Sequence, residues 1–412
     1  MSWTKTRTLG LTYHDPAKAF PGYTLFASVR ARHATLIDMD GQIVHQWHDE
    51  EGIQHPALLD DGNLLLHTSP PPYLEESERI GGSTISMKQM GWDGKVLWEY
   101  RNKRMHHDFV RLANGNYLTL LIEGLPDGMT EQVKGGTPGD EDPDVMWGDK
   151  AVEITPSGEI VWEWNSWEHL DLENDVICPL DNRKEWTHIN SLSMTPDGDM
   201  LMSFRQTSFV AIVDRKTGAF KWKWGKGELS HQHNATWLGT GKILIFDNGP
   251  HRARTTTYSR VIEVDPATDE IGWKYQADPM VGFFSVGISG AQRLPNGNTL
   301  ICEGVHGRFF EVSQEGEVVW EYINPFFAEG RYGISNGTFR VYRYAPDHPG
   351  LRGKDLSPDN YHELNDRINA GLPATEGGIL EPAIGVTEES ESNDGPDGDP
   401  DSDRNSNKGA KK

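Results

Sequence analysis

The chain has 412 residues, a formal net charge of −23 at pH 7, 14 tryptophans, and only two cysteines, which are too few for a disulfide framework. The acidic excess argues against nucleic acid as a partner, because contact with a phosphate backbone needs a basic surface. The sequence has no apolar run long enough to cross a membrane and no signal-peptide pattern at its start, so we expect a cytoplasmic protein without a membrane partner.

Residues 1–20 show no regular pattern and predict an irregular lead-in. Residues 21–346 repeat a unit of four short strands, in which alternating apolar residues are separated by turns rich in Gly, Asn and Asp. The second half of the unit is a strand, a polar turn and a strand that carries tryptophan. It occurs at residues 34–47, 85–100, 151–164, 209–224, 260–275 and 308–322. The first half recurs as often, for example as DGNLLL at 61 and NGNTLI at 296.

Six such units predict an all-β fold, a six-bladed β-propeller, because a single blade cannot bury both of its faces and therefore stacks in a ring. The first unit lacks an innermost strand, whereas residues 337–346 form a predicted strand with no blade of its own. We therefore expect this C-terminal strand to complete blade one and close the ring. The tryptophans expected to pack the blades together are Trp47, Trp98, Trp162, Trp222, Trp273 and Trp320.

Three longer segments interrupt the repeat, at residues 125–150, 165–185 and 249–259, and are expected to lie over one face or in solvent. Residues 347–375 predict a C-terminal extension with helical character, with Ser357 and Pro358 as cap and first turn. Residues 376–412 are acidic, polar and almost without apolar side chains, which predicts a disordered tail.

The innermost strands of a propeller line its central channel, and here they are rich in histidine. In four units a histidine lies seven to ten residues before the turn glycine, so we expect these imidazoles to meet around the axis. Such a cluster could bind a metal ion or perform acid–base or nucleophilic chemistry. Arg205 and Arg252 follow the second strands of neighbouring units, and guanidinium groups beside the histidines favour an anion with several oxygens.

Several of these segments together resemble the aryl-sulfate sulfotransferases, six-bladed propellers that need no nucleotide sulfate donor. The resemblance spans roughly residues 20–346. It rests on His-x-Asn-Ser at His188, Ser-x-Arg at Arg205, Gln-His at His233 and Phe-Asp-Asn-Gly at 246–249. It implies ping-pong transfer of a sulfuryl group from an aryl sulfate ester to a phenolic acceptor through a sulfohistidine, with no cofactor.

By motif, the resemblance implies that His306 in EGVHGR is the nucleophile, with His188 and His233 as acid–base and sulfuryl-contacting residues. Arg252 would hold the sulfuryl oxygens. Two alternatives stay open from the residues alone. One is a propeller hydrolase or lyase that uses the same side chains, with or without a channel metal, and the other is a non-catalytic ligand-binding propeller. The residues expected to bind substrate are Arg252, Arg205, Asn190, His107, His55 and Arg340.

Overall fold

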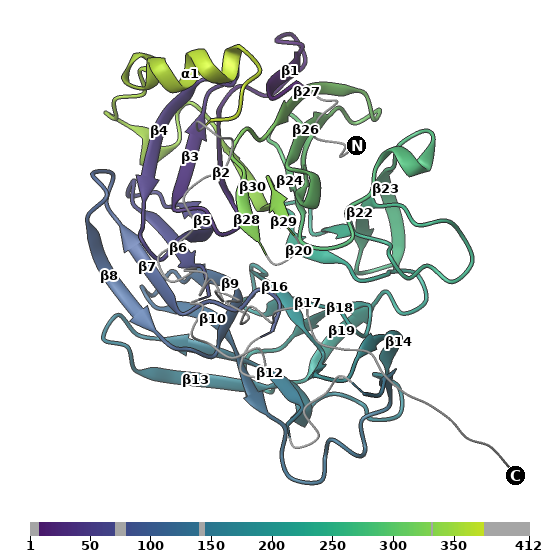
Figure 1. The fold of residues 1–412 in the computed structure, drawn as a ribbon. Coiled ribbons are helices and arrows are strands. Elements are labelled where there is room, and N and C mark those ends of the chain that lie inside the picture. The colour runs from purple at the N-terminus through teal and green to yellow at the C-terminus, as the bar shows by residue number, and fades with distance from the viewer. Residues whose placement is uncertain (1–7, 71–79, 140–144, 331–332, 375–412) are drawn as a thin grey trace, which may run out of the picture.

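Six blades, each with four antiparallel strands, form a ring in the computed structural model, which describes residues 8–70, 80–139, 145–330 and 333–374 (Figure 1). The predicted six-bladed β-propeller is therefore confirmed. The innermost strands of the blades are β30 (Thr338–Tyr344), β5 (Ile53–Leu58), β9 (Met105–Arg111), β16 (Ile189–Met194), β20 (His233–Trp237) and β24 (Gly290–Arg293).

The remaining strands of each blade follow outward in chain order. Blades one to three continue with β2 (Tyr23–Ser28), β3 (His33–Ile37) and β4 (Ile43–His48); β6 (Leu64–Thr68), β7 (Ser86–Met90) and β8 (Val96–Arg101); and β10 (Tyr117–Gly124), β12 (Trp147–Ile154) and β13 (Ile160–Asn165). Blades four to six continue with β17 (Met200–Phe204), β18 (Phe209–Val213) and β19 (Phe220–Trp224); β21 (Ile243–Asp247), β22 (Arg260–Asp265) and β23 (Glu270–Tyr275); and β25 (Thr299–Glu303), β26 (Arg308–Val312) and β27 (Val318–Ile323).

The ring closes at two places. Strand β30 pairs antiparallel with β2, with Tyr344 opposite Tyr23, which confirms the predicted C-terminal closing strand. Strand β1 (Gly10–His14) pairs with β27, the outer strand of blade six, with Gly10 opposite Ile323. The expectation of a wholly irregular lead-in was wrong here. The segment GLTYH has no clear alternation, and an edge pairing rather than its own pattern makes it a strand.

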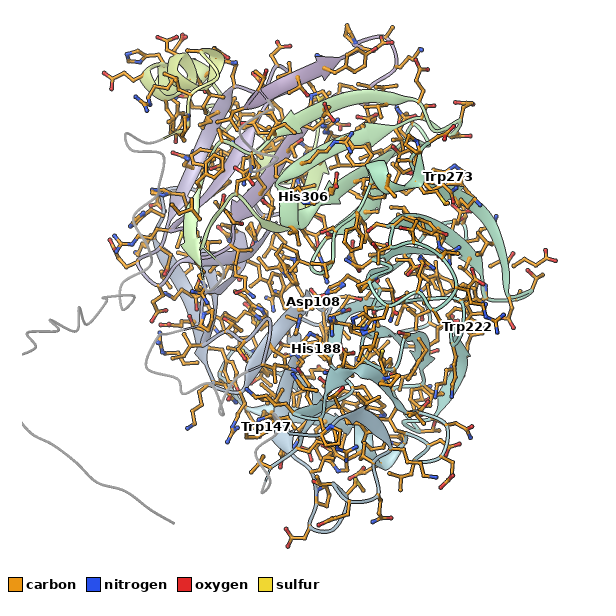
Figure 2. The ribbon with its side chains drawn as sticks, turned by 45° about the vertical axis from the view of Figure 1, so that its right-hand side comes forward. Asp108, Trp147, His188, Trp222, Trp273 and His306 are labelled. Carbon is orange, nitrogen blue, oxygen red and sulfur yellow. The ribbon has the colours of Figure 1, made fainter. Side chains whose placement is uncertain are left out.

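A repeated hydrogen bond joins neighbouring blades at the rim. The indole N–H groups of Trp98, Trp162, Trp222, Trp273 and Trp320 each donate to the turn between the third and fourth strands of the next blade, at 2.8–3.1 Å. The last of these bonds runs from blade six to Met39 O of blade one, so the series crosses the closure. Figure 2 shows Trp222 and Trp273 at the periphery of the ring.

Blade one departs from the expected alignment by two residues. His45, not Trp47, lies opposite Leu36 at the position that tryptophan holds elsewhere. Its Nε2 donates to Trp92 O at 3.0 Å, and its ring stacks on Trp92. Trp47 lies two residues further along β4 and is fully buried. Histidine can replace tryptophan here because both rings present an N–H donor on a flat surface.

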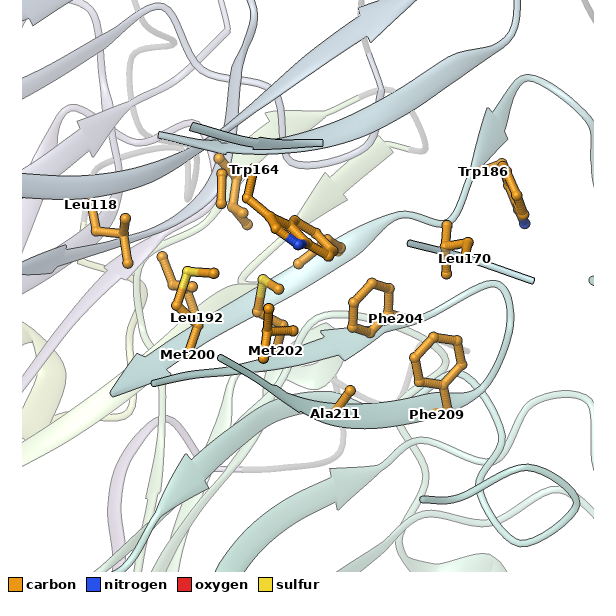
Figure 3. Close-up of a cluster of buried hydrophobic side chains, with 14 of the residues drawn as sticks. Leu118, Trp164, Leu170, Trp186, Leu192, Met200, Met202, Phe204, Phe209 and Ala211 are labelled. Atoms are coloured by element: carbon orange, nitrogen blue, oxygen red, sulfur yellow. The ribbon is translucent and has the colours of Figure 1, made fainter. Parts of the chain in front are cut away.

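The apolar cores lie between adjacent blades. Figure 3 shows the one between blades three and four, where Leu118 and Trp164 face Met202, Phe204 and Phe209. Leu170, from the interruption at 165–185, and Trp186, directly after it, extend this core. Burial of these side chains anchors the segment against the propeller instead of leaving it in solvent.

The interruptions at 125–150 and 165–185 pair with each other. Strand β11 (Gly135–Thr137) lies parallel to β14 (Ile177–Asn182), and β15 (Glu185–Trp186) adds to the edge of β12. A short hairpin of β28 (Ala328–Gly330) and β29 (Gly333–Ser335) precedes the closing strand. The 3₁₀ turns of the chain are η3 (Ser166–Glu168), η4 (Met280–Gly282), η5 (Gly304–His306), η6 (Pro349–Leu351) and η7 (Pro358–Tyr361).

The C-terminal extension covers blade one. Ser357 caps η7, and α1 (His362–Asn369) follows it directly. Asn365 bonds the backbone of Ile43 in both directions, which fixes the helix against β4. Throughout the described ranges, no helix has both the length and the apolar character needed to span a membrane. The predicted disordered tail, residues 376–412, lies outside the described residues.

Candidate functional site

The inner strands are irregular where they meet the mouth of the channel. Strands β5, β9, β16, β20 and β30 each shift register against their neighbour near their first residues. Three residues at these places have left-handed backbone: His107 (φ 54°), His188 (φ 61°) and Asn234 (φ 50°). An extra residue in a strand bends it and redirects its side chains. The bulges therefore lie where the sequence places its histidines.

A buried ion pair crosses the channel. Arg340 on β30 donates from Nη1 to Asp108 Oδ2 at 2.7 Å and from Nη2 to Asn190 O at 2.8 Å. The same carboxylate accepts the backbone N–H of Phe109 (3.0 Å) and of Leu192 (2.8 Å). The side chains of Asp108 and Arg340 are each 3% exposed. This ion pair links blades one, three and four, because each supplies one part of it.

His55 packs beside this pair. Its Nδ1 lies 3.6 Å from Asp108 Oδ1, its Nε2 lies 3.2 Å from Tyr342 Oη, and its ring stacks on Phe109. Burial lowers the pKa of His55 well below its usual range, and the charge of Arg340 lowers it further. The imidazole is therefore neutral near pH 7. His55 and Arg340, both predicted substrate-binding residues, bond mainly to protein groups.

Three histidines meet at the mouth, on blades three, four and five. The His107 and His188 rings lie edge to face, 4.5 Å between centroids. Burial lowers the pKa of His107 well below its ordinary value, and His188, His106 and His233 add to this effect. Gly82 lies over the His107 ring, with φ of 77°, and a Cβ there would lie 2.4 Å from Nε2. Only glycine fits this contact.

Two carboxylates lie close to His188, and the sequence did not reveal either of them. Its Nδ1 lies 2.8 Å from Glu185 Oε2, on the short strand β15. Asp149 accepts the backbone N–H groups of Thr187 (2.9 Å) and Ile189 (3.0 Å), on either side of His188. These bonds stabilise the left-handed backbone that turns His188 toward His107. Figure 2 shows His188 and Asp108 in the middle of the ring.

His233 has the most fully determined geometry. Its Nδ1 lies 2.8 Å from Asn248 Oδ1. The amide orientation of Asn248 is fixed because its Nδ2 donates to two carbonyl oxygens, Ser285 O (2.9 Å) and Ile288 O (3.1 Å). The amide oxygen can only accept, so Nδ1 carries the proton of the neutral ring and Nε2 keeps its lone pair. Burial, with Arg205 next in importance, lowers the pKa of His233 well below its ordinary value.

The remaining predicted residues lie in different surroundings. The backbone N–H of Arg205 donates to His188 O at 3.1 Å, and its side chain is 20% exposed. Arg252 donates to the buried carboxylate of Asp247 at 2.5 Å, which it shares with Arg260. Asn190 donates its side-chain amide to Gln232 O at 2.8 Å and so links blades four and five.

His306 ends the 3₁₀ turn η5 in blade six and is 35% exposed. Its Nδ1 lies 3.2 Å from Glu303 Oε1, and this carboxylate also pairs with Arg308 at 3.1 Å. His306 therefore has a carboxylate partner within its own blade, whereas His107, His188 and His233 come together from three blades. The sequence assignment of His306 as nucleophile stays a prediction.

The structure thus groups His55, His107, His188, His233 and Arg340, with Asn190 and Arg205 next to them. Sequence reasoning assigned no role to Asp108, Asp149, Glu185 and Asn248, which bond to these side chains or lie beside them. Two of the four had a visible signal: Asp108 directly follows the histidine pair, and Asn248 lies in the Phe-Asp-Asn-Gly element.

A family model described as Arylsulfotransferase (ASST) matches residues 87–325, more than half of the chain. No functionally curated protein matches the sequence. Among solved structures, a protein of unknown function from Bacteroides caccae is similar at 14% identity and a TM-score of 0.50, covering 78% of this chain and 98% of that one. A streptogramin B lyase is similar at 10% identity and a TM-score of 0.44, covering 82% of this chain and 93% of that one. At these identities the structural likeness concerns the fold alone.

Proposed function

Because the chain belongs to the arylsulfotransferase family, we propose that it transfers a sulfuryl group from an aryl sulfate ester to a phenolic acceptor at the mouth of its channel. Such a reaction needs a nucleophilic nitrogen with a free lone pair, positive charge near the sulfuryl oxygens, and an acid that protonates the departing phenolate. The channel mouth offers side chains suited to each of these requirements.

The observation that carries the proposal is the bond from His233 Nδ1 to Asn248 Oδ1. It fixes the tautomer in which Nε2 is the free nucleophilic atom. In catalytic triads, too, a second side chain holds one nitrogen of a histidine ring and so fixes the tautomer and direction of the reactive nitrogen. We therefore assign the attacking nitrogen to His233 Nε2, and the resemblance-based alternative, His306, becomes the competing assignment.

The neighbouring side chains supply the other two requirements. His188, whose Nδ1 lies beside Glu185, can hold the proton that the leaving phenolate takes up. Arg205 is the better placed cation for the sulfuryl oxygens. Its backbone bonds to His188, its charge lowers the pKa of His233, and its side chain is partly exposed. Arg252 is less suited, because Asp247 pairs with it at 2.5 Å, whereas Arg205 lies 3.8 Å from its acidic neighbour, Asp181.

The reaction balances in two steps. In the first, a bond forms between His233 Nε2 and sulfur, the bond between sulfur and the aryl oxygen breaks, and the phenolate takes a proton from His188. In the second, His188 accepts the proton of the incoming phenol, whose oxygen attacks sulfur and releases the His233 nitrogen. The protein ends unchanged, and no oxidant or reductant is required.

The test is intact-protein mass spectrometry after mixing with para-nitrophenyl sulfate, followed by a peptide map. Wild type should gain one sulfuryl group on His233 and lose it when phenol is added, and His233→Ala should gain none. His48→Ala is the matched control, since His48 is an exposed histidine beside His33 and Glu50. It should be labelled as wild type is.

The variants His306→Ala and His233→Ala together separate the two assignments. An adduct on His306 that persists in His233→Ala, and is lost in His306→Ala, would return the nucleophile to the position that the sequence resemblance implies. If wild type forms no adduct and releases no nitrophenol with this donor or with other aryl sulfates, the sulfuryl-transfer proposal fails.

A further inference from the structure

Four metal-ligating side chains meet outside the residues used above. Cys178 and Asp181 lie on β14, His231 lies two residues before β20, and His251 lies in the segment after β21. Their ligand atoms all lie within 4.8 Å of one another. Cys178 Sγ is 3.3 Å from His251 Nδ1, and His231 Nε2 is 2.5 Å from Asp181 Oδ2. The two imidazole rings lie edge to face, 4.3 Å between centroids.

We propose that these four side chains bind one divalent transition-metal ion, with Zn²⁺ as the preferred ion. One thiolate, two imidazoles and one carboxylate make the mixed N, O and S donor set that Zn²⁺ accepts in tetrahedral sites. Thiolate and imidazole ligands disfavour Mg²⁺ and Ca²⁺, which take oxygen ligands. The thiolate and the carboxylate together neutralise the charge of a divalent ion, which offsets the cost of burying it.

The donor atoms reach tetrahedral separations after shifts of about 1 Å. With ligand bonds of about 2.0–2.3 Å, donor atoms around a tetrahedral Zn²⁺ lie roughly 3.3–3.8 Å apart. The Cys178 and His251 donor atoms already have this separation. The Asp181 and His231 atoms, now at hydrogen-bond distance, would have to separate by about 1 Å to become two ligands.

The backbone beneath the ligands is held by other bonds. The N–H of Cys178 donates to Gln206 O at 2.9 Å, that of His231 to Ser208 Oγ at 3.2 Å, and that of His251 to Ser230 Oγ at 3.1 Å. The pairing of β14 with β11 adds further support. The ligands are therefore placed on a prepared scaffold that does not depend on the ion.

The expected role is structural. With four protein ligands the ion has no open position for substrate, as in closed structural zinc sites. It would fasten β14, part of the segment between blades three and four, to two loops of blade five. His231 O lies 3.2 Å from His233 Nδ1, so the ion would also stiffen the backbone next to that residue. Arg205 lies beside Asp181 at 3.8 Å, and a metal-bound Asp181 would leave this arginine freer to bind an anion.

The sequence predicted no metal ligand at these positions, because the four residues come from three segments and form no spacing motif. The test uses the full-length, untagged protein, equilibrated with Zn²⁺, dialysed and analysed by elemental mass spectrometry. We expect about one Zn²⁺ per chain. In Cys178→Ala and His251→Ala the affinity for Zn²⁺ should be lower by a factor of at least about 100. Cys302→Ala is the control, because Cys302 is buried, donates to Thr338 O and lies outside the cluster.

Replacement by Co²⁺ gives a second readout. A tetrahedral thiolate site should produce an intense visible spectrum with a sulfur-to-cobalt charge-transfer band, and Cys178→Ala should lack that band. Zn²⁺ content below about 0.1 per chain would overturn the proposal. Zn²⁺ binding in Cys178→Ala and His251→Ala that is as tight as in wild type would also overturn it. So would a wild-type cobalt spectrum without the charge-transfer band. None of these readouts depends on sulfuryl transfer.

Discussion

The Asp108–Arg340 pair should contribute more to stability than any exposed ion pair of the propeller. In Arg340→Met the carboxylate of Asp108 stays buried and keeps only the N–H groups of Phe109 and Leu192 as close donors. Breaking one side of a buried pair typically costs about 3–5 kcal/mol, because an uncompensated charge remains inside the protein. We expect a loss of this size in the free energy of unfolding, measured by urea titration with tryptophan fluorescence.

The double variant Asp108→Asn/Arg340→Met makes the test specific. It removes both charges, so its loss should be smaller than the sum of the two single losses by at least about 1 kcal/mol. Lys18→Met, which breaks the exposed pair with Glu317, should leave the urea midpoint almost unchanged. If Arg340→Met costs less than about 1 kcal/mol, or if the two losses simply add, the buried pair does not stabilise the ring.

Three further predictions concern separate features. His67 is buried and its pKa is lowered to about 3, mainly by burial, so only the unfolded chain takes up this proton between pH 6.5 and 4. The free energy of unfolding should therefore decrease as the pH is lowered through this range. His67→Gln should reduce the slope of this free energy against pH by up to about 1.4 kcal/mol per pH unit in urea titrations. Trp162→Phe removes the indole bond to Arg215 O and should cost about 1 kcal/mol or more in the same assay. Asn248→Leu should slow sulfuryl labelling of His233 about tenfold or more, with the thermal midpoint of unfolding as the control for folding.

Each of these has a clear contrary result. An unchanged pH slope in His67→Gln would mean that the folded chain protonates this imidazole as readily as the unfolded chain does. A Trp162→Phe variant as stable as wild type would show that water replaces the indole bond without loss. If a folded Asn248→Leu variant is labelled at the wild-type rate, the amide of Asn248 does not position His233 for the reaction.

Local sequence predicted most of the fold because the blade repeats its turn and strand pattern. The pattern located the blades and the closing strand, since each depends on residues close together in the chain. It placed Trp47 two residues out of register, because His45 performs the same inter-blade bond with a different ring. It also missed β1, because that strand exists only through its pairing with β27.

The candidate site was less predictable for a physical reason. The histidines were visible because they recur at equivalent places, but their partners come from other blades: Asp108 meets Arg340 across 232 positions of sequence. Asn248 shows its importance only once its amide is seen to bond to two carbonyls on one side and His233 on the other. Contacts of this kind follow from the closed ring and not from any single strand.

Closure of the ring and assembly of the channel mouth are one event in this chain. Strand β30 completes blade one, and the same strand delivers Arg340 to Asp108 and Tyr342 to His55. Until β30 is paired, the carboxylate of Asp108 lacks its cation and the inner ends of blades three and four lack their link to blade one. The histidines at the mouth can therefore reach their final geometry only in the closed propeller, which ties any chemistry at His233 to the integrity of the whole ring.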